Sequence, residues 1–395
     1  MCASRNYIIV LAVFTFITTV SAVDRDPDPY EARLLSVLSA IQSAELELAR
    51  ELALTLVADY PTSRIGAALL GDIYSGFNSP LSDFGLQLKI DDPEQAQGLH
   101  HELLARKGLT DFYPDEGLVP AALLDIGNAP YVILGDMEHS RLYVYRNEDG
   151  YPKLVADYYM TIGLKGIGKQ VEGDQRTPVG VYQITHFIPD NELPDLYGAG
   201  AYPVDYPNVL DKGLKRTGYG IWLHGTPSDQ YSRVPYASDG CFVVSNRDFE
   251  DLAKYIDGDV GTPVLLSANV EWVANESVET LKTHFMDSFR EWEEAWESLD
   301  VERYQQLYNS RKFGFSSIAF EKWLTGKKRV MQTAKYIRVD TAISGLFVYP
   351  GEQDTILVKY AQKFESDTFK DNSQKQMYWQ RNDVGEWRII YEGDA

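Results

Sequence analysis

The spacing of apolar residues changes along this chain, and these changes constrain its fold more than any single motif does. Between residues 30 and 57, and again from 65 to 74, apolar residues recur at near-helical intervals. From about residue 128 to 266, aromatic and β-branched residues form short alternating runs that are typical of strands. A helical stretch at 280–300 then precedes longer strand runs. The sequence therefore predicts a multidomain protein with helical, β-rich and α+β parts in that order.

Four segments are expected. Residues 1–22 are predicted to be a signal peptide, because Arg5 precedes an apolar run that closes with the small residues Val20-Ser21-Ala22. That run is short for a membrane span. Residues 23–125 should form an N-terminal α-helical domain and 126–268 the β-rich domain. Residues 277–395 should form the α+β domain and fold alone, because they contain their own helix and sheet.

The net charge of the chain and its predicted N-terminal helices limit the kinds of partner that it can bind. The chain has 395 residues and a formal net charge of −21, which argues against nucleic acid and anionic membrane surfaces. The two predicted N-terminal helices resemble one tetratricopeptide-type pair, which is weak evidence for a repeat array. We favour a helical cap, or a homodimer formed through this helical domain.

Cys241 is the only cysteine that remains once the signal peptide is removed. A lone thiol in an exported chain has no disulfide partner and is either a buried apolar side chain or a nucleophile. Cys241 follows Gly240, and it lies seventeen positions after His224, which itself precedes Gly225. This pairing of Gly-Cys with His-Gly favours the nucleophile.

Acyl transfer by a thiol requires a base, a group that orients the base, and donors for the oxyanion. We expect His224 to be the base and the carbonyl of Gly225 to accept its second N–H group. The backbone N–H groups of Gly240 and Cys241 are expected to form the oxyanion hole. We also expect an activated thiol, with the pKa of Cys241 below its free value. The scattered histidines lack zinc-ligand spacing, so neither metal nor cofactor is predicted.

Residues 128–268 resemble the catalytic domain of the L,D-transpeptidase family. The resemblance rests on three motifs that together are far more specific than any one alone: Gly173-Asp174-Gln175-Arg176-Thr177-Pro178-Val179-Gly180-Val181-Tyr182, His224-Gly225 and Ser238-Asp239-Gly240-Cys241. It implies attack of Cys241 on the bond after the L-centre of the third residue of a peptidoglycan stem peptide, with release of the terminal D-alanine. An amine acceptor then gives a cross-link or an anchored protein, and water gives L,D-carboxypeptidase activity.

The resemblance also implies a site around these motifs. Ser238 and Asp239 would belong to the nucleophile loop, and Trp222, Thr226 and Arg233 would contact substrate. Two departures from the family's pattern affect this loop: Asp239 stands where many members have histidine, and Val243 where many have arginine. Arg233 or Arg247 is a candidate to supply the missing cation. Because peptidoglycan lies outside the cytoplasmic membrane, the expected location is the periplasm of a Gram-negative envelope.

The C-terminal segment resembles the cone-like nuclear-transport-factor-two-like fold, on an aromatic set that we interpret mainly as core: Trp292, Trp296, Tyr304, Tyr308, Tyr378, Trp379 and Trp387. Together with the other domains, this layout is similar to L,D-carboxypeptidases that trim tetrapeptides in cell-shape control. A wall or protein ligand is expected for the C-terminal domain. A non-catalytic wall-binding adaptor is the alternative, although it has little use for Cys241 and His224. A papain-like peptidase is disfavoured, because here the histidine precedes the cysteine.

Overall fold

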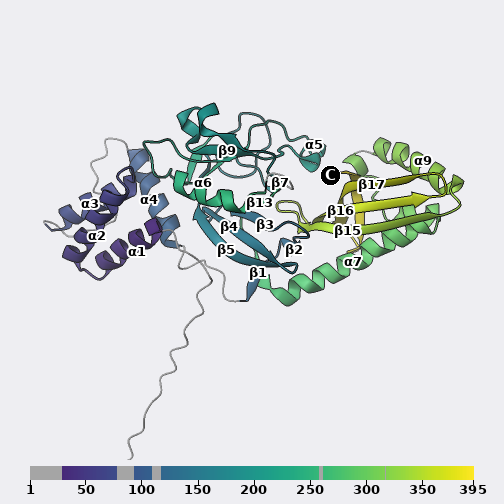
Figure 1. The fold of residues 1–395 in the computed structure, drawn as a ribbon, viewed down its shortest axis with the longest axis horizontal. Helices are drawn as coiled ribbons and strands as arrows, with labels where there is room; N and C mark the ends of the chain where they lie inside the picture. The colour runs from purple at the N-terminus through teal and green to yellow at the C-terminus, as the bar shows by residue number, and fades with distance from the viewer. Residues whose placement is uncertain (1–28, 78–92, 109–116, 258–260, 316) are drawn as a thin grey trace, which may run out of the picture.

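A computed structural model of the chain describes residues 29–77, 93–108, 117–257, 261–315 and 317–395. The expected signal peptide, residues 1–22, lies outside these ranges. Helices α1–α4 occupy one end of the molecule, a β-rich part lies in the middle, and a long helix with a twisted sheet forms the other end (Figure 1). This arrangement confirms the predicted multidomain architecture. Among the described residues, no helix is long and apolar enough to cross a membrane.

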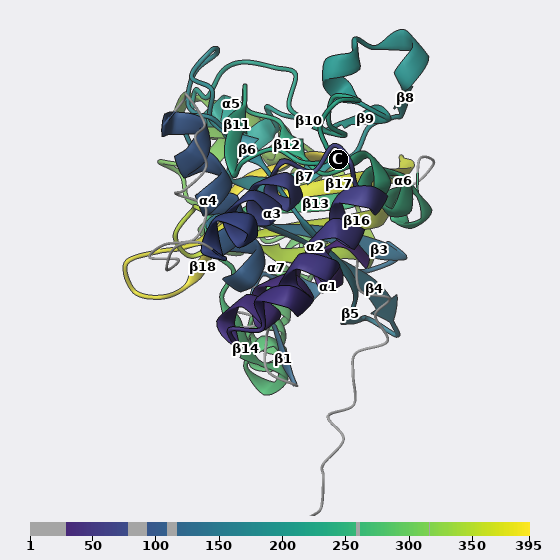
Figure 2. The same ribbon diagram turned by 90° about the vertical axis from the view of Figure 1, so that its left-hand side faces the viewer.

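The N-terminal part is a group of packed helices, which face the viewer in Figure 2. Their bounds are α1 (Pro29–Gln42), α2 (Leu46–Asp59), α3 (Arg64–Gly76) and α4 (Pro93–Lys107). The helical pattern of residues 30–57 is interrupted at Ala44, which has a φ of +59°. Helix α3 begins after Ser63, whose hydroxyl accepts a hydrogen bond from the N–H of Gly66 over 2.9 Å.

The middle part contains a five-stranded sheet with the order β5-β4-β3-β13-β7. Its strands are β3 (Tyr131–Asp136), β4 (Arg141–Glu148), β5 (Tyr151–Tyr159), β7 (Gly180–Gln183) and β13 (Pro263–Ser267). The predicted β3-β4-β5 meander is antiparallel, and β13 runs parallel to β3. Helix α6 (Asn246–Leu252) and the following 3₁₀ turn (Ala253–Tyr255) match the helix that was predicted at 247–255.

A second sheet of the middle part, with the order β12-β10-β9-β8, carries the candidate site. Its strands are β8 (Ile188–Pro189), β9 (Gly200–Pro203), β10 (Trp222–His224) and β12 (Phe242–Val243). A separate strand pair, β6 (Ile162–Gly163) with β11 (Tyr236–Ser238), lies beside it. Leu223 and Phe242 share one apolar core with Ile133 and Leu266 of the five-stranded sheet. The core of the middle part therefore joins both sheets and fixes the second sheet on the first.

The C-terminal part packs a long helix on an antiparallel sheet. The helices are α7 (Asn275–Glu297), α8 (Val301–Gln306) and α9 (Ser317–Thr333), and the strands are β15 (Ile337–Val348), β16 (Thr355–Ser366), β17 (Lys370–Arg381) and β18 (Trp387–Asp394). Phe285 and Phe289 of α7 lie against Trp379 of β17. The aromatic set that the sequence analysis interpreted as core is buried: all of its members except Tyr378 lie in one apolar core, and Tyr378 lies in a neighbouring one.

The C-terminal sheet is not self-contained. Strand β2 (Leu123–Asp125) pairs with β15 as the edge of this sheet, and β1 (Leu118–Pro120) pairs with β14 (Trp272–Ala274). A further apolar core contains Leu134 and Val181 of the middle part together with Leu357 and Tyr378 of the C-terminal sheet. This shared core opposes the expectation that residues 277–395 fold alone, because their isolation would expose one side of it.

The N-terminal helices meet the middle part through buried charges. Glu31 of α1 accepts hydrogen bonds from Arg106 of α4 over 2.9 Å and from Arg141 of β4 over 2.8 Å, and Arg141 also pairs with Asp157. These four side chains are at most 5% exposed. Removing one partner would leave another charge buried without compensation, so this cluster fixes the helices in one orientation.

Candidate active site

His224 is the last residue of strand β10, and Cys241 immediately precedes strand β12, which runs parallel to β10. In the β10–β12 pair, Leu223 is opposite Phe242 and His224 is opposite Val243. One step back in this register, Cys241 stands beside Trp222. Because side chains alternate between the faces of a strand, Leu223 and Phe242 enter the core while Trp222, His224 and Cys241 belong to the other face. The register thus brings the predicted nucleophile and base to one face of the sheet.

His224 is 3% exposed and is held by its neighbour. Its Nδ1 atom lies 2.7 Å from the carbonyl oxygen of Gly225. A carbonyl only accepts, so this contact assigns the proton to Nδ1 and leaves Nε2 as the acceptor that a general base needs. Burial lowers the pKa of His224 to about 4; the Gly225 hydrogen bond opposes this shift and the charge of Arg233 adds to it. The imidazole is therefore neutral at physiological pH.

The thiol of Cys241 is not activated in the way that the sequence analysis expected. Its thiol is partly buried and donates a weak hydrogen bond to the carbonyl of Gly220 over 3.4 Å. Burial raises the pKa of Cys241 to about 11, although the backbone N–H of Trp222 partly opposes the shift. The predicted low pKa is thus wrong for this state, because removal from water outweighs the nearby donors. No hydrogen bond joins Cys241 to His224 within the described ranges, so attack requires the thiol to leave Gly220 and turn.

The nucleophile loop is fixed by Ser238. Its hydroxyl donates to the carbonyl of Cys241 over 2.6 Å and accepts from the N–H of Gly240 over 3.1 Å. The N–H of Gly240 is therefore occupied, which corrects its expected role as an oxyanion donor. Gly240 has a φ of +123°, and a Cβ atom there would lie 2.8 Å from the carbonyl oxygen of Arg176. Only glycine fits this turn, which precedes the N–H of Cys241.

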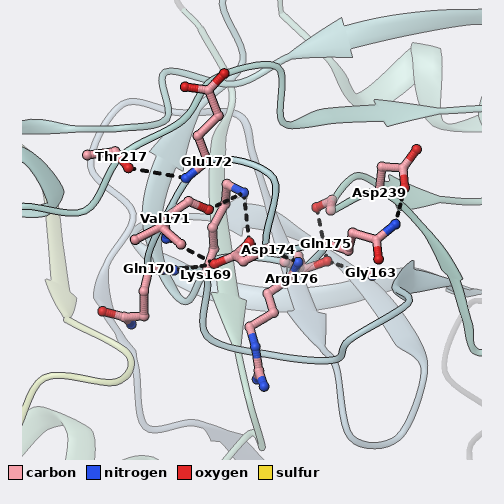
Figure 3. A network of polar contacts seen from close by, with 12 residues as sticks. Gly163, Lys169, Gln170, Val171, Glu172, Asp174, Gln175, Arg176, Thr217 and Asp239 are labelled. Carbon is pink, nitrogen blue, oxygen red and sulfur yellow. Dashed lines mark hydrogen bonds and ion pairs between the residues drawn. The ribbon is translucent and has the colours of Figure 1, made fainter.

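The upstream Gly-Asp-Gln-Arg-Thr-Pro motif holds this loop in place through hydrogen bonds. Thr177 is fully buried; its hydroxyl donates to the carbonyl of Gly240 over 3.0 Å and accepts from the N–H of Gly163 over 2.9 Å. Gln175 donates to the carboxylate of Asp239 over 2.8 Å (Figure 3). Asp239, which stands in place of the family's histidine, is itself exposed. The motif acts as a brace for residues 239–240.

Asp174 organises the motif internally (Figure 3). Its carboxylate accepts hydrogen bonds from the Lys169 ammonium over 2.9 Å and from the backbone N–H groups of Gln170, Val171 and Arg176 over 2.7–3.1 Å. Burial acts to raise the pKa of Asp174, but these donors prevail and lower it to about 2. Asp174 is therefore ionised at physiological pH and holds the turn together.

The three residues that were expected to contact substrate differ in their burial and in their contacts. Trp222 is partly buried, and its ring packs on Tyr197 with centroids 4.9 Å apart. Arg233 is partly buried, and its charge acts on both Cys241 and Asp239. Thr226 is 1% exposed and donates its hydroxyl to the carbonyl of Gln230 over 2.8 Å. We therefore correct the expectation for Thr226, which holds the loop that follows His224.

The position of the family's arginine and the two arginines that could replace it differ in burial and in contacts. Val243, where many family members have arginine, is 1% exposed and exchanges backbone hydrogen bonds with Thr161 over 2.8 and 2.9 Å. Arg247 reaches away to the hydroxyl of Tyr60 over 3.1 Å. Of the two candidates, Arg233 is the cation that acts on the thiol.

Two further residues shape the site and were not singled out from the sequence. The ring of Tyr197 packs edge-on against His224, with centroids 5.0 Å apart. The side-chain oxygen of Asn246 accepts from the N–H groups of Ala199 and Thr226, and its amide donates to the carbonyl of Thr226 over 2.8 Å. No local pattern marks Tyr197, whereas Asn246 was detectable as a polar residue at the start of a predicted helix.

Comparisons with known proteins agree with this geometry. Residues 130–266 match the L,D-transpeptidase catalytic domain, and residues 284–393 match the Cds6 C-terminal NTF2-like domain. The structure of Bd1075 from Bdellovibrio bacteriovorus is 32% identical, covers 70% of this chain and 98% of its own, and gives a TM-score of 0.61. No curated protein sequence matches the chain.

A second solved structure has the same fold. It is that of the helical cell shape determining protein Pgp2 from Campylobacter jejuni, which is 22% identical over 73% of this chain and 99% of its own, with a TM-score of 0.58. Together with the Bdellovibrio structure, these matches show that the chain belongs to the L,D-transpeptidase catalytic-domain family, in the architecture that adds a C-terminal NTF2-like domain. They support a role on peptidoglycan.

Proposed function

We propose that this protein is a cysteine acyl-transfer enzyme that acts on peptidoglycan stem peptides. The observation that carries the proposal is the β10–β12 register, which brings Cys241 and a His224 of fixed tautomer to one face of the L,D-transpeptidase domain. A neutral thiol beside a neutral imidazole suits a reaction in which the proton moves as the bond forms.

The reaction follows from these roles. Nε2 of His224 takes the thiol proton while the sulfur of Cys241 attacks the carbonyl after the L-centre of the third stem residue. The N–H of Cys241 donates to the developing oxyanion, since that of Gly240 is occupied by Ser238. When the tetrahedral intermediate collapses, the imidazolium protonates the leaving amine of D-alanine. A thioester on Cys241 remains.

We favour water as the acceptor of the acyl group, which makes the enzyme an L,D-carboxypeptidase that trims tetrapeptide to tripeptide. Hydrolysis needs only a water molecule and the same base, whereas cross-linking needs a second pocket for an amine. Asp239 and Val243 replace groups that many cross-linking members carry beside the nucleophile, which supports hydrolysis. Transpeptidation to an amine is the second candidate, and it follows from the family itself.

The remaining proposals concern location and partners. We propose export to the periplasm and a role in the wall remodelling that sets cell shape, in keeping with the likeness to Pgp2. A homodimer through the helices, and a wall or protein ligand of the C-terminal domain, remain predictions. The adaptor alternative is disfavoured, because the hydrogen bonds around Ser238 and Thr177 serve a nucleophile loop that an adaptor would not need.

Incubation of the full chain with disaccharide tetrapeptide tests the proposal. We expect release of D-alanine, with tripeptide as a major product by mass spectrometry, and neither product with Cys241→Ala. If only cross-linked dimers or D-amino-acid exchange products form, hydrolysis is excluded and transpeptidation remains. Comparison of muropeptides from wall digests with and without the enzyme tests the same point on the polymer.

A further inference from the structure

A cavity of about 260 Å³ lies where the N-terminal helices meet the loop that leads to the nucleophile. Its wall on the helical side includes Arg64 of α3 and Gly98 and Glu102 of α4, and its wall on the loop side includes Ser232, Arg233 and Ala237. Arg233 belongs both to this wall and to the surroundings of Cys241, on which its charge acts. Ala237 of the same wall directly precedes Ser238, so the cavity adjoins the nucleophile loop.

The acidic residue of this wall is already neutralised. Glu102 accepts hydrogen bonds from Arg106 over 3.1 Å and from Ser232 over 2.6 Å. It is 1% exposed, and burial raises the pKa of its carboxyl group despite these partners. Glu102 thus contributes little free negative charge to the cavity.

The two arginines of the wall lack such neutralisation. The guanidinium of Arg233 donates to the carbonyl of Ala237 over 3.3 Å, and neither Arg233 nor Arg64 forms an ion pair with a carboxylate in the described part of the chain. Burial lowers the pKa of Arg233, which shows that its neighbours do not fully compensate its charge. In a chain with a net charge of −21, these two arginines place positive charge at one cavity.

The helices also hold the loop that carries Arg233. The N–H of Tyr231 donates to the carbonyl of Thr62 over 3.1 Å, and the ring of Tyr231 packs on Tyr30 with centroids 4.0 Å apart. At Gly98, an added Cβ atom would lie 2.9 Å from Val234. The position of Arg233 therefore depends on the helical segment, although none of the helices carries a catalytic group.

We propose that this cavity is a carboxylate-binding subsite, in which Arg64 and Arg233 hold a free carboxylate of the stem peptide while its scissile carbonyl lies at Cys241. Guanidinium groups bind carboxylates through paired, charge-assisted hydrogen bonds, which gives orientation as well as affinity. The inference rests on the proposed function for the identity of the substrate. It gives the helical segment a second use beyond a cap or dimer contact: it forms one wall of the substrate site.

Binding to the inactive full chain tests the subsite without turnover. Calorimetry with Cys241→Ala would compare the free tetrapeptide with forms in which the carboxylates are amidated one at a time. Amidation of the carboxylate that occupies the cavity should weaken binding about tenfold. Adding Arg64→Ala or Arg233→Ala should cause a similar loss for the free peptide and little further loss for that amide. The amide that shows this behaviour identifies which carboxylate is bound.

Three variants serve as controls. Arg50→Ala removes a partly exposed arginine of α2 outside the cavity and should leave affinity unchanged. Arg233→Lys keeps the charge but loses the paired geometry, so it should recover part of the affinity. Gly98→Val should weaken binding by displacing Val234 and the loop. Thermal melting of each variant verifies folding, and Arg64→Ala carries the test if Arg233→Ala misfolds, because Arg64 is exposed.

The outcomes separate this inference from the proposed function. If both arginine variants bind the free and amidated peptides with equal affinity, the subsite is wrong, whatever the wild-type chain does to the peptide. If the Cys241→Ala chain shows the carboxylate dependence but the wild-type chain releases no D-alanine, the subsite stands and the proposed reaction fails. Equal losses for every amide would also overturn the subsite, because they would indicate general charge attraction.

Discussion

The hydroxyl of Thr177 donates a hydrogen bond to the carbonyl of Gly240 over 3.0 Å, which ties the upstream motif to the residue before the nucleophile. The same hydroxyl accepts from the N–H of Gly163. Thr177→Val keeps the shape but leaves both backbone groups buried without a partner. We expect it to lower the free energy of unfolding by about 2 kcal/mol and to lower kcat. Chemical denaturation and D-alanine release would measure these effects.

Thr177→Ser is the matched control for this brace, because it retains the hydroxyl and loses only a methyl group. It should stay close to wild type in kcat. If Thr177→Val kept wild-type kcat at temperatures where it is folded, the brace would have no role in positioning Cys241.

The thiol should react slowly at neutral pH in the absence of substrate. Burial raises the pKa of Cys241 to about 11, so little thiolate is present near pH 7. The rate of alkylation by iodoacetamide should therefore still be rising above pH 9, with its midpoint near 11. His224→Ala should leave this profile unchanged while it removes most turnover. A labelling midpoint below 9 would indicate an activated thiol and contradict the neutral resting pair.

The pH at which activity falls on the acid side (the acid limb) should lie well below the ordinary pKa of histidine. A general base works only when neutral, and burial lowers the pKa of His224 to about 4. As pH falls, kcat/KM should therefore hold through pH 6 and decline only as pH approaches 4. NMR titration of the His224 ring would assign this limb. An acid limb near 6.5 that tracks His224 would mean that the ring is accessible to water in the free enzyme.

The isolated C-terminal segment should be unstable. Without Leu123–Asp125 the sheet loses its β2 edge, and Leu357 and Tyr378 lose their apolar neighbours from the middle part. We expect residues 277–395 to lack a cooperative melting transition and residues 118–395 to retain one. Calorimetry on the two fragments checks this. Cooperative unfolding of the shorter fragment would restore the independence that its own helix and sheet first suggested.

The sequence was sufficient where a feature depends on neighbouring residues. Period-two runs located β3, β4 and β5, and the His-Gly and Gly-Cys motifs picked out two residues that the β10–β12 register brings to one face. The sequence was insufficient for features that depend on contacts between residues far apart in the chain. The thiol pKa depends on burial by several segments, β2 joins a sheet more than 200 positions away, and the occupied N–H of Gly240 depends on the rotamer of Ser238. Tyr197 reaches His224 only through the tertiary fold.

The central claim is that Cys241 forms a thioester with the stem peptide, and intact-mass spectrometry of the full chain tests it most directly. The enzyme would be mixed with disaccharide tetrapeptide and quenched in acid during turnover. We predict an added mass equal to the substrate minus D-alanine, located on the peptide that contains Cys241, with no such adduct on Cys241→Ala. Release of D-alanine by Cys241→Ala at the wild-type rate would contradict the account, because the bond would then break without this thiol.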